Sequence, residues 1–199
     1  MKIYRIEQKS DYFASNVFVV ENNGEGVLID AGINYDEIKE FADEKGITLR
    51  YCLLTHGHFD HTRACGELQK NGVKICCLKE EEDLVNDDKG NASYLFEGEV
   101  FHPFKIDETF TDGEVINLIG LTFKVLKTSG HTKGSCCYFV ENACFSGDTL
   151  FDGGYGRCDL PTGNYGEMMQ SLRKLLRSEK EYVVYTGHGE NTVIGKKNV

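Results

Sequence analysis

The sequence lacks any long uninterrupted apolar stretch. No run approaches the roughly 18 residues that a membrane-spanning helix requires, so we expect no membrane partner. The N-terminal segment MKIYRIEQKSDYF contains no apolar core of the kind found in secretory signal peptides. We therefore expect a cytoplasmic protein.

The sequence is also poor in positive charge. It contains 22 lysines and arginines against 32 aspartates and glutamates, which gives a formal net charge of −10. Because an acidic surface repels a phosphate backbone, this balance argues against nucleic acid as the main partner.

Paired C-x-x-C motifs are absent, although the chain contains eight cysteines. Their absence excludes a zinc ribbon and a thioredoxin-type redox motif. Most of the cysteines lie in apolar segments such as VKICCL (73–78) and SCCYFV (135–140), where a reduced cysteine behaves as a small buried hydrophobic residue. Cys158 is the exception, because it lies in the polar segment GRCDLP.

Hydrophobic periodicity predicts a mixture of strands and helices along the whole chain. The predicted strands cover residues 16–21, 26–32, 49–55, 73–78, 114–119, 121–128, 135–141, 143–147 and 181–186. The predicted helices cover residues 34–46, 61–72, 80–85 and 164–178. Since no linker or low-complexity tract interrupts this pattern, we expect residues 1–199 to form a single α/β domain of packed layers.

One short segment carries a high density of metal-binding side chains. In THGHFDH (55–61), the residues His56, His58, Asp60 and His61 follow directly on a predicted strand. In a turn, His56 and His58 can point one way while Asp60 and His61 point another, so one loop can serve two adjacent metal sites. The alternative interpretation is a polar loop that binds no metal.

Three further candidate ligands lie in separate loops that also follow strands. His131 lies in LKTSGHTKGS, Asp148 in FSGDTLF and His188 in VVYTGHGE, and each comes directly after a glycine. Glycine permits the sharp turns and close approach that loops around an ion require. By contrast, His102 stands alone beside Pro103 and is interpreted as a plain loop residue.

The seven candidate ligands are too many for one tetrahedral ion. They suit two divalent ions that share a bridging carboxylate. Imidazole and carboxylate groups bind zinc, iron and manganese. We expect zinc in the first place, with iron and manganese as alternatives.

The motifs VLIDAG (27–32), THGHFDH, SGHTKGS, FSGDTLF and YTGHG together resemble those of the metallo-β-lactamase superfamily over essentially the whole chain. The resemblance implies an α/β fold, classed as α+β in some schemes. This fold is a four-layer αβ/βα sandwich with the metal site at the edge of its two sheets. The implied ligands are His56, His58 and His131 for the first metal, Asp60, His61 and His188 for the second, and Asp148 as the bridge. Asp30 matches an aspartate that supports the site.

Within the superfamily, residues 147–175 and 183–198 resemble short glyoxalase II-like hydrolases. Three features depart from that pattern. The sequence ends before the C-terminal helical region with which full-length glyoxalase II binds glutathione. Lys133 stands where proline is frequent, and Cys158 stands where threonine or serine is usual. We interpret Cys158 as a packing residue, with weak ligation or redox sensitivity as the alternative.

The resemblance implies a metal-dependent hydrolase of a small-molecule thioester, either an S-acylglutathione or a related thiol ester. A metal-bridging hydroxide would attack the carbonyl carbon, and Asp60 would orient it as the catalytic residue. Asp30 and Asp159 are candidate hydrogen-bond acceptors for ligating histidines. The thiolate leaving group needs little help from an acid, because free thiols have a pKa of about 8.5.

Three other activities remain as alternatives. A mononuclear iron persulfide dioxygenase shares this fold, and His56, His131 and Asp148 would suffice to hold its iron. A nuclease uses the same first motif but is disfavoured by the acidic composition. Lactam hydrolysis is disfavoured by the GHTKGS and GDTLF motifs and by the expected cytosolic location.

Overall fold

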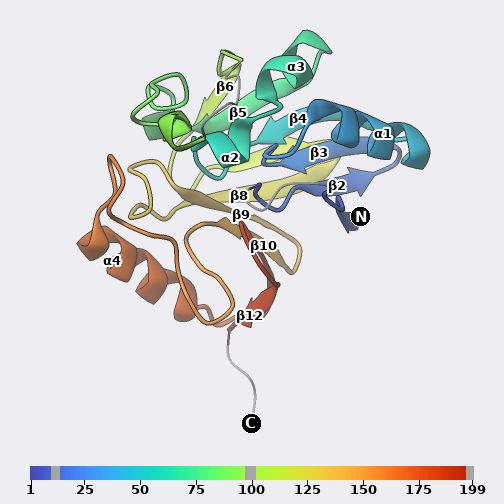
Figure 1. The fold of residues 1–199 in the computed structure, drawn as a ribbon. Helices are drawn as coiled ribbons and strands as arrows, with labels where there is room; N and C mark the ends of the chain where they lie inside the picture. The colour runs from blue at the N-terminus through green and yellow to red at the C-terminus, as the bar shows by residue number, and fades with distance from the viewer. Residues whose placement is uncertain (10–13, 97–101, 196–199) are drawn as a thin grey trace.

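The structure is a computed structural model that describes residues 1–9, 14–96 and 102–195. Two six-stranded sheets lie face to face, and helices cover their outer faces (Figure 1). The strand orders are β1-β2-β3-β4-β5-β6 and β12-β11-β10-β9-β8-β7. The predicted four-layer αβ/βα sandwich is therefore confirmed.

The first sheet comes from the N-terminal half of the chain. Its strands are β1 (Lys2–Arg5), β2 (Phe18–Asn22), β3 (Glu25–Ile29), β4 (Thr48–Leu53), β5 (Lys74–Leu78) and β6 (Glu108–Phe110). The first three strands are antiparallel, whereas β3 to β6 run parallel to one another. The parallel connections carry α1 (Tyr35–Lys45), α2 (Phe59–Thr62) and α3 (Cys65–Lys70). Parallel strands end at the same edge of a sheet, so the loops after β3 and β4 are neighbours.

The second sheet comes from the C-terminal half. Its strands are β7 (Val115–Leu118), β8 (Leu121–Lys127), β9 (Cys136–Val140), β10 (Ala143–Gly147), β11 (Tyr182–Thr186) and β12 (Thr192–Ile194). Only β10 and β11 pair in parallel among these strands, and α4 (Tyr165–Leu176) connects them. The loops after β10 and β11 therefore also meet at one edge.

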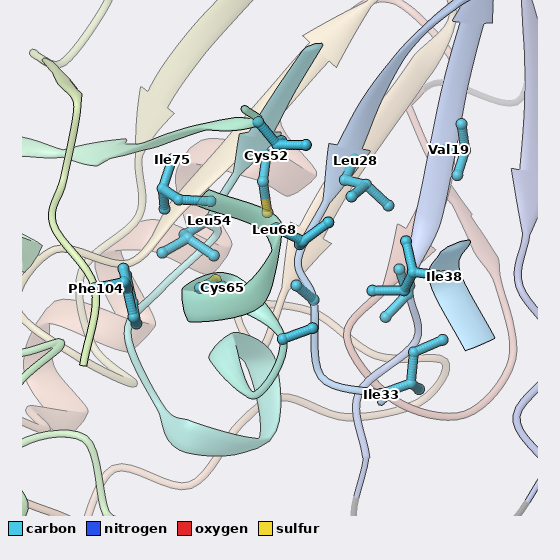
Figure 2. Packing of buried hydrophobic residues seen from close by; sticks show 14 of the residues in the cluster. Val19, Leu28, Ile33, Ile38, Cys52, Leu54, Cys65, Leu68, Ile75 and Phe104 are labelled. Atoms are coloured by element: carbon cyan, nitrogen blue, oxygen red, sulfur yellow. The ribbon is translucent and has the colours of Figure 1, made fainter. Parts of the chain in front are cut away.

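Three hydrophobic clusters hold the four layers together, and they follow from the alternation of side chains along each strand. In β2, Val19 faces α1 and α3 in the outer cluster drawn in Figure 2, whereas Phe18 and Val20 face the second sheet. In β9, Tyr138 faces the first sheet, whereas Cys137 packs in the cluster under α4. Burial of β3, β9 and β10 on both faces fixes their register, because a slip by one residue would exchange the two faces.

Local sequence signals set the ends of the two long helices. α1 ends at Gly46, which adopts the left-handed conformation (φ 65°) that glycine tolerates best. α4 begins at Asn164, whose side-chain oxygen accepts a hydrogen bond from the backbone N–H of Glu167 at 3.1 Å. Both helices lie within the ranges that the sequence predicts.

The predicted helix over 61–72 is confirmed only in part. Its second half is α3, whose C-cap is Asn71, but α2 and α3 are separate helices. The backbone N–H of Ala64 donates to Ala31 at 2.9 Å, and the carbonyl of Asp60 accepts from Ser15 at 3.1 Å. Both groups are thereby diverted from the helical hydrogen-bond ladder to the segments that flank β2 and β3. The diversion ties the segment that carries His58, Asp60 and His61 to the end of β3.

The predicted helix over 80–85 is wrong. A 3₁₀ turn, η1 (Lys79–Glu81), occupies its start. Further turns follow, closed by hydrogen bonds such as the one from the Leu84 N–H to the Glu81 carbonyl at 2.9 Å.

The short strands β1, β6 and β12 were not predicted from the sequence. Within the described ranges, none of the helices combines the length and the hydropathy that a membrane crossing requires.

Candidate metal centre

All seven sequence-predicted ligands converge at one edge of the sandwich. The first four lie in the loop after β4 and in α2. His131 lies in the turn between β8 and β9, Asp148 directly follows β10, and His188 follows β11. Their nitrogen and oxygen atoms form overlapping groups whose members lie within 4.8 Å of one another. The groups are His56–His58–His131, His56–His61–Asp148 and Asp60–His61–His188.

The first group, here called the three-histidine group, consists of His56, His58 and His131. All three side chains are buried, with ring centroids 4.5–4.8 Å apart. The Nδ1–H of His131 donates to the backbone carbonyl of Arg157 at 2.7 Å, which leaves the Nε2 lone pair of His131 directed at Nδ1 of His58, 2.8 Å away. The arrangement brings one nitrogen of each ring within 4.8 Å of the others.

The second group, here called the mixed group, consists of Asp60, His61 and His188. The Nε2 atoms of His61 and His188 lie 3.3 Å apart, and a carboxylate oxygen of Asp60 lies 3.2 Å from Nε2 of His188. This group is more open than the first, because the side chains of Asp60 and His188 are 18% and 34% exposed.

Asp148 lies between the two groups. Its carboxylate oxygens are 3.3 Å from Nε2 of His61, 3.5 Å from Nε2 of His131 and 3.7 Å from Nε2 of His188. One carboxylate thus reaches histidines of both groups. This geometry is the one that a bridging ligand requires.

Asp30 anchors the mixed group, as the sequence suggested. One oxygen of Asp30 accepts from the backbone N–H of Thr55 at 2.7 Å, and the other accepts from the Thr55 hydroxyl and from Nδ1–H of His61, each at 2.8 Å. Asp30 itself adopts a left-handed conformation (φ 59°). The bond to Nδ1 fixes the His61 ring with Nε2 facing the centre.

Glycines bring the loops into contact at two places. A Cβ at Gly147 would lie 2.2 Å from the Thr55 hydroxyl oxygen, and Gly147 has a positive φ of 49°. A Cβ at Gly187 would lie 2.2 Å from Oδ1 of Asp148. The glycines that precede Asp148 and His188 therefore serve the close approach that the sequence suggested.

The two groups differ in how readily their histidines take up protons. Burial, together with neighbouring histidines, holds the pKa of His56 well below its usual value and lowers the pKa of His58 to about 3. These two rings are therefore neutral at physiological pH, which is the state that binds a metal.

In the mixed group, nearby carboxylates raise the pKa of the histidines. Burial alone would lower the pKa of His61 and His188, but the carboxylates raise both values. Asp30, Asp148 and Asp60 act on His61, and Asp60 and Asp148 act on His188. Burial alone would raise the pKa of Asp60 and Asp148, but the surrounding histidines lower both. The mixed group is therefore a strongly coupled set of positive and negative charges.

The buried polar atoms fit a bound cation. Nε2 of His56, Nε2 of His58 and Oδ1 of Asp148 are buried and have no hydrogen-bond partner among the described residues. Leaving such an atom unpaired costs about 1–3 kcal/mol, so a native fold tolerates it where a ligand completes the site. Neutral imidazoles and carboxylates suit first-row divalent ions.

Asp159 does not play the part that the sequence suggested. Its exposed carboxylate forms a bidentate ion pair with Arg157 at 2.7 and 2.8 Å, and the backbone carbonyl of Arg157 supports His131 instead.

Cys158 belongs to none of the ligand groups. Its Sγ lies 3.4 Å from the carbonyl oxygen of Gly156, and burial raises the pKa of its thiol. His102 is an exposed loop residue, as expected.

A cavity of about 660 Å³ opens over the centre. His58, Asp60, His131, Asp148 and His188 line its floor. The walls of the cavity are mainly apolar, and two arginines add guanidinium groups. The apolar residues are Ala92, Leu95, Phe96, Phe151 and Leu160, and the arginines are Arg63 and Arg157. Sequence reasoning missed these wall residues, because they come from irregular segments without periodicity.

Comparison with known proteins defines the class. The model of the metallo-β-lactamase superfamily matches residues 11–188, and the chain belongs to this superfamily. The chain is 34% identical to hydroxyacylglutathione hydrolase GloC of Haemophilus influenzae, over 85% of this chain and 82% of that protein.

Two solved structures show the same fold at somewhat lower identity. BLEG-1, described as a B3 metallo-β-lactamase, has a TM-score of 0.89 and 27% identity, with 96% of this chain and 94% of that chain covered. TTHA1623 in a di-iron-bound form has a TM-score of 0.80 and 28% identity, with 92% and 91% covered.

Proposed function

We propose that this metallohydrolase cleaves thioesters, with two divalent metal ions held by the seven converging residues. His56, His58 and His131 would hold one ion, and Asp60, His61 and His188 the other, with Asp148 between them. The observation that carries the proposal is the reach of Asp148 to histidines of both groups at 3.3–3.7 Å. The likeness to GloC of Haemophilus influenzae supports a thioester as substrate.

The residues of the chain would divide the work around the ions. When bound, two divalent ions lower the pKa of a shared water and polarise a carbonyl group. Asp60 lines the cavity, and its lowered pKa keeps it a carboxylate. As the proposed catalytic residue, it would accept a hydrogen bond from the attacking water and orient it. A thiolate leaves without a strong acid, because its conjugate thiol has a pKa of about 8.5.

The cavity walls indicate where a substrate would lie. The apolar side chains of Leu95, Phe96 and Phe151 offer a surface for the acyl group. Arg157 also lines the cavity, so the polar end of a thiol carrier would meet the ion pair of Arg157 with Asp159 there. A panel of thioesters with acyl groups of increasing length, on one thiol, tests the apolar wall directly.

The experiment that tests the proposal replaces Asp148 with alanine and measures zinc, iron and manganese content alongside thioester turnover. We expect Asp148→Ala to lower turnover about a thousandfold, because loss of the shared ligand removes several kcal/mol of transition-state stabilisation. His102→Ala, a histidine outside the groups, is the matched control and should match the wild type. Full activity and full metal content in Asp148→Ala would defeat the bridging assignment.

A second candidate activity, lactam hydrolysis, is favoured by the likeness to BLEG-1. Turnover of a chromogenic cephalosporin by the zinc-loaded protein would reveal it. The dioxygenase alternative is separated by oxygen uptake with a glutathione persulfide, measured on iron-loaded protein. We expect thioester turnover to exceed both other activities.

A further inference from the structure

Glu81 is a buried glutamate outside the proposed ligand set. Its side chain is fully buried in the 3₁₀ turn η1 after β5, whereas the adjacent Glu80 and Glu82 are exposed. It belongs to none of the ligand groups and does not line the cavity. Burial of a carboxylate is costly unless it is hydrogen-bonded, and only the Oε1 atom of Glu81 has a hydrogen-bond partner among the described residues.

Glu81 contacts the first metal-binding loop through its Oε1 atom. This oxygen accepts a hydrogen bond from the backbone N–H of Gly57 at 2.9 Å, and Gly57 lies between His56 and His58. The loop lies directly on the turn, because a Cβ at Gly57 would come within 2.9 Å of the side chains of Leu84 and Val85. Glu81 therefore fixes the backbone between two candidate ligands.

The other oxygen of Glu81 faces the second metal-binding loop. A Cβ at Gly134 would lie 2.4 Å from Oε2 of Glu81 and 2.7 Å from its backbone nitrogen. Gly134 is three residues beyond His131, in a turn closed by a 3.0 Å bond from the Thr132 amide to the Ser135 hydroxyl and by a 2.8 Å bond between the hydroxyls of Thr132 and Ser135. Only a residue without a side chain permits this approach.

The polar groups around Glu81 counteract the effect of burial on the pKa of its carboxyl group. Burial raises the pKa of the Glu81 carboxyl, whereas the Gly57 and Gly134 amides and the Thr132 hydroxyl act to lower it. These three groups belong to the two loops that carry the three-histidine group. The carboxylate of Glu81 thus lies between two loops that are far apart in the sequence, since 73 positions separate His58 from His131.

We propose that Glu81 is a positioning residue that holds the loop of His56 and His58 in register with the loop of His131, so that the three-histidine group is formed before a metal arrives. This inference rests on the proposed metal centre. Glu81 acts through the backbone of both loops and not through contact with the ion. Its removal would leave the three ligands in the chain but less well aligned.

The test measures zinc affinity of the metal-free protein by competition with a chromophoric chelator, and the visible spectrum after cobalt loading. We expect Glu81→Gln to weaken the tighter zinc site by roughly 10- to 100-fold, as loss of a supporting partner does at other metal sites. The cobalt ligand-field bands of Glu81→Gln should also shift. Glu82→Gln, an exposed neighbour on the same turn, is the matched control and should bind as the wild type does.

A second pair of variants keeps the inference falsifiable if Glu81→Gln does not fold. Gly134→Ala drives a methyl group against Glu81 and should weaken zinc binding in the same way. Gly154→Ala is its control, because a Cβ there meets nothing within 4 Å. Unchanged zinc affinity and an unchanged cobalt spectrum in a folded Glu81→Gln or Gly134→Ala would overturn the positioning role. A wild-type protein that binds no zinc would instead overturn the metal centre itself.

Discussion

The three-histidine group and the mixed group occupy the same edge of the sandwich but differ in burial and charge. The three-histidine group is almost closed to solvent, and burial keeps His56 and His58 neutral. The mixed group is partly open and combines carboxylates with histidines whose pKa they raise. Under the proposed function, the difference predicts that the three-histidine group holds its ion more tightly than the more exposed mixed group does.

The largest effect is expected when one histidine is removed from either group, and this tests directly whether the two groups hold metal independently. His188 belongs to the mixed group alone, whereas His56 belongs to two of the overlapping groups. We expect His188→Ala to keep about one metal per chain and His56→Ala to keep less, with thioester turnover reduced about a thousandfold in both. Elemental analysis of the two purified variants provides the comparison. Equal loss of metal in both would remove the distinction between the groups.

A smaller effect is expected when the support of the mixed group is weakened. Asp30→Asn removes the charge that faces His61 and places an amide N–H₂ against donors from Thr55 or His61. Breaking such a buried pair costs about 3–5 kcal/mol, so we expect a lower free energy of unfolding in urea. Asp36→Asn, on the exposed face of α1, is the control. Unchanged stability of Asp30→Asn would show that the buried contacts of Asp30 contribute little.

Acidification sharpens the comparison further. A pKa of about 3 for His58 means that protons do not compete for that ring between about pH 8 and pH 5.5, whereas the raised pKa values of His61 and His188 mean that protons do. Zinc affinity of the mixed group should therefore fall about tenfold per pH unit for each proton that the metal displaces. It should fall more steeply than that of the three-histidine group, because the rings of His56 and His58 do not take up protons in this range. Chelator competition across this range measures both sites. Simultaneous loss of both metals would contradict the assignment.

The smallest expected effect concerns the cavity wall over the open site. Leu95 lines the cavity and is half exposed. Leu95→Ala should raise KM for a long-chain acyl thioester roughly 3- to 10-fold, since the loss of a few buried methylene groups weakens apolar binding by about 1 kcal/mol. Turnover of an acetyl thioester should stay unchanged. An equal effect on both substrates would place the acyl group elsewhere.

The sequence was most informative where metal-binding residue types stand directly after predicted strands. His56, His58, Asp60 and His61 stand together after a strand, and the remaining candidates follow glycines at strand ends, so their convergence could be predicted. Apolar residues likewise predict most strands of both sheets. They form continuous runs in β3, β9 and β10, which are buried on both faces, and alternate in β7 and β8, which are buried on one face.

The rest depends on partners that are distant in the sequence. Glu81 lies in a run of three glutamates that is typical of a solvated turn, and only the approach of Gly57 and Gly134 explains its burial. The support of His131 by the backbone carbonyl of Arg157 has no sequence signature, and the prediction of Asp159 as its hydrogen-bond acceptor is therefore wrong. The helix over 61–72 is interrupted by the bond from Ala64 to Ala31, which local propensity does not reveal.

The most direct test of the central claim is an anomalous difference map from a crystal grown with zinc, with data collected at the zinc absorption edge. We expect two peaks, one within the three-histidine group and one within the mixed group, with Asp148 in contact with both. A single peak, or histidine rings turned toward solvent with no peak among them, would contradict the two-metal account.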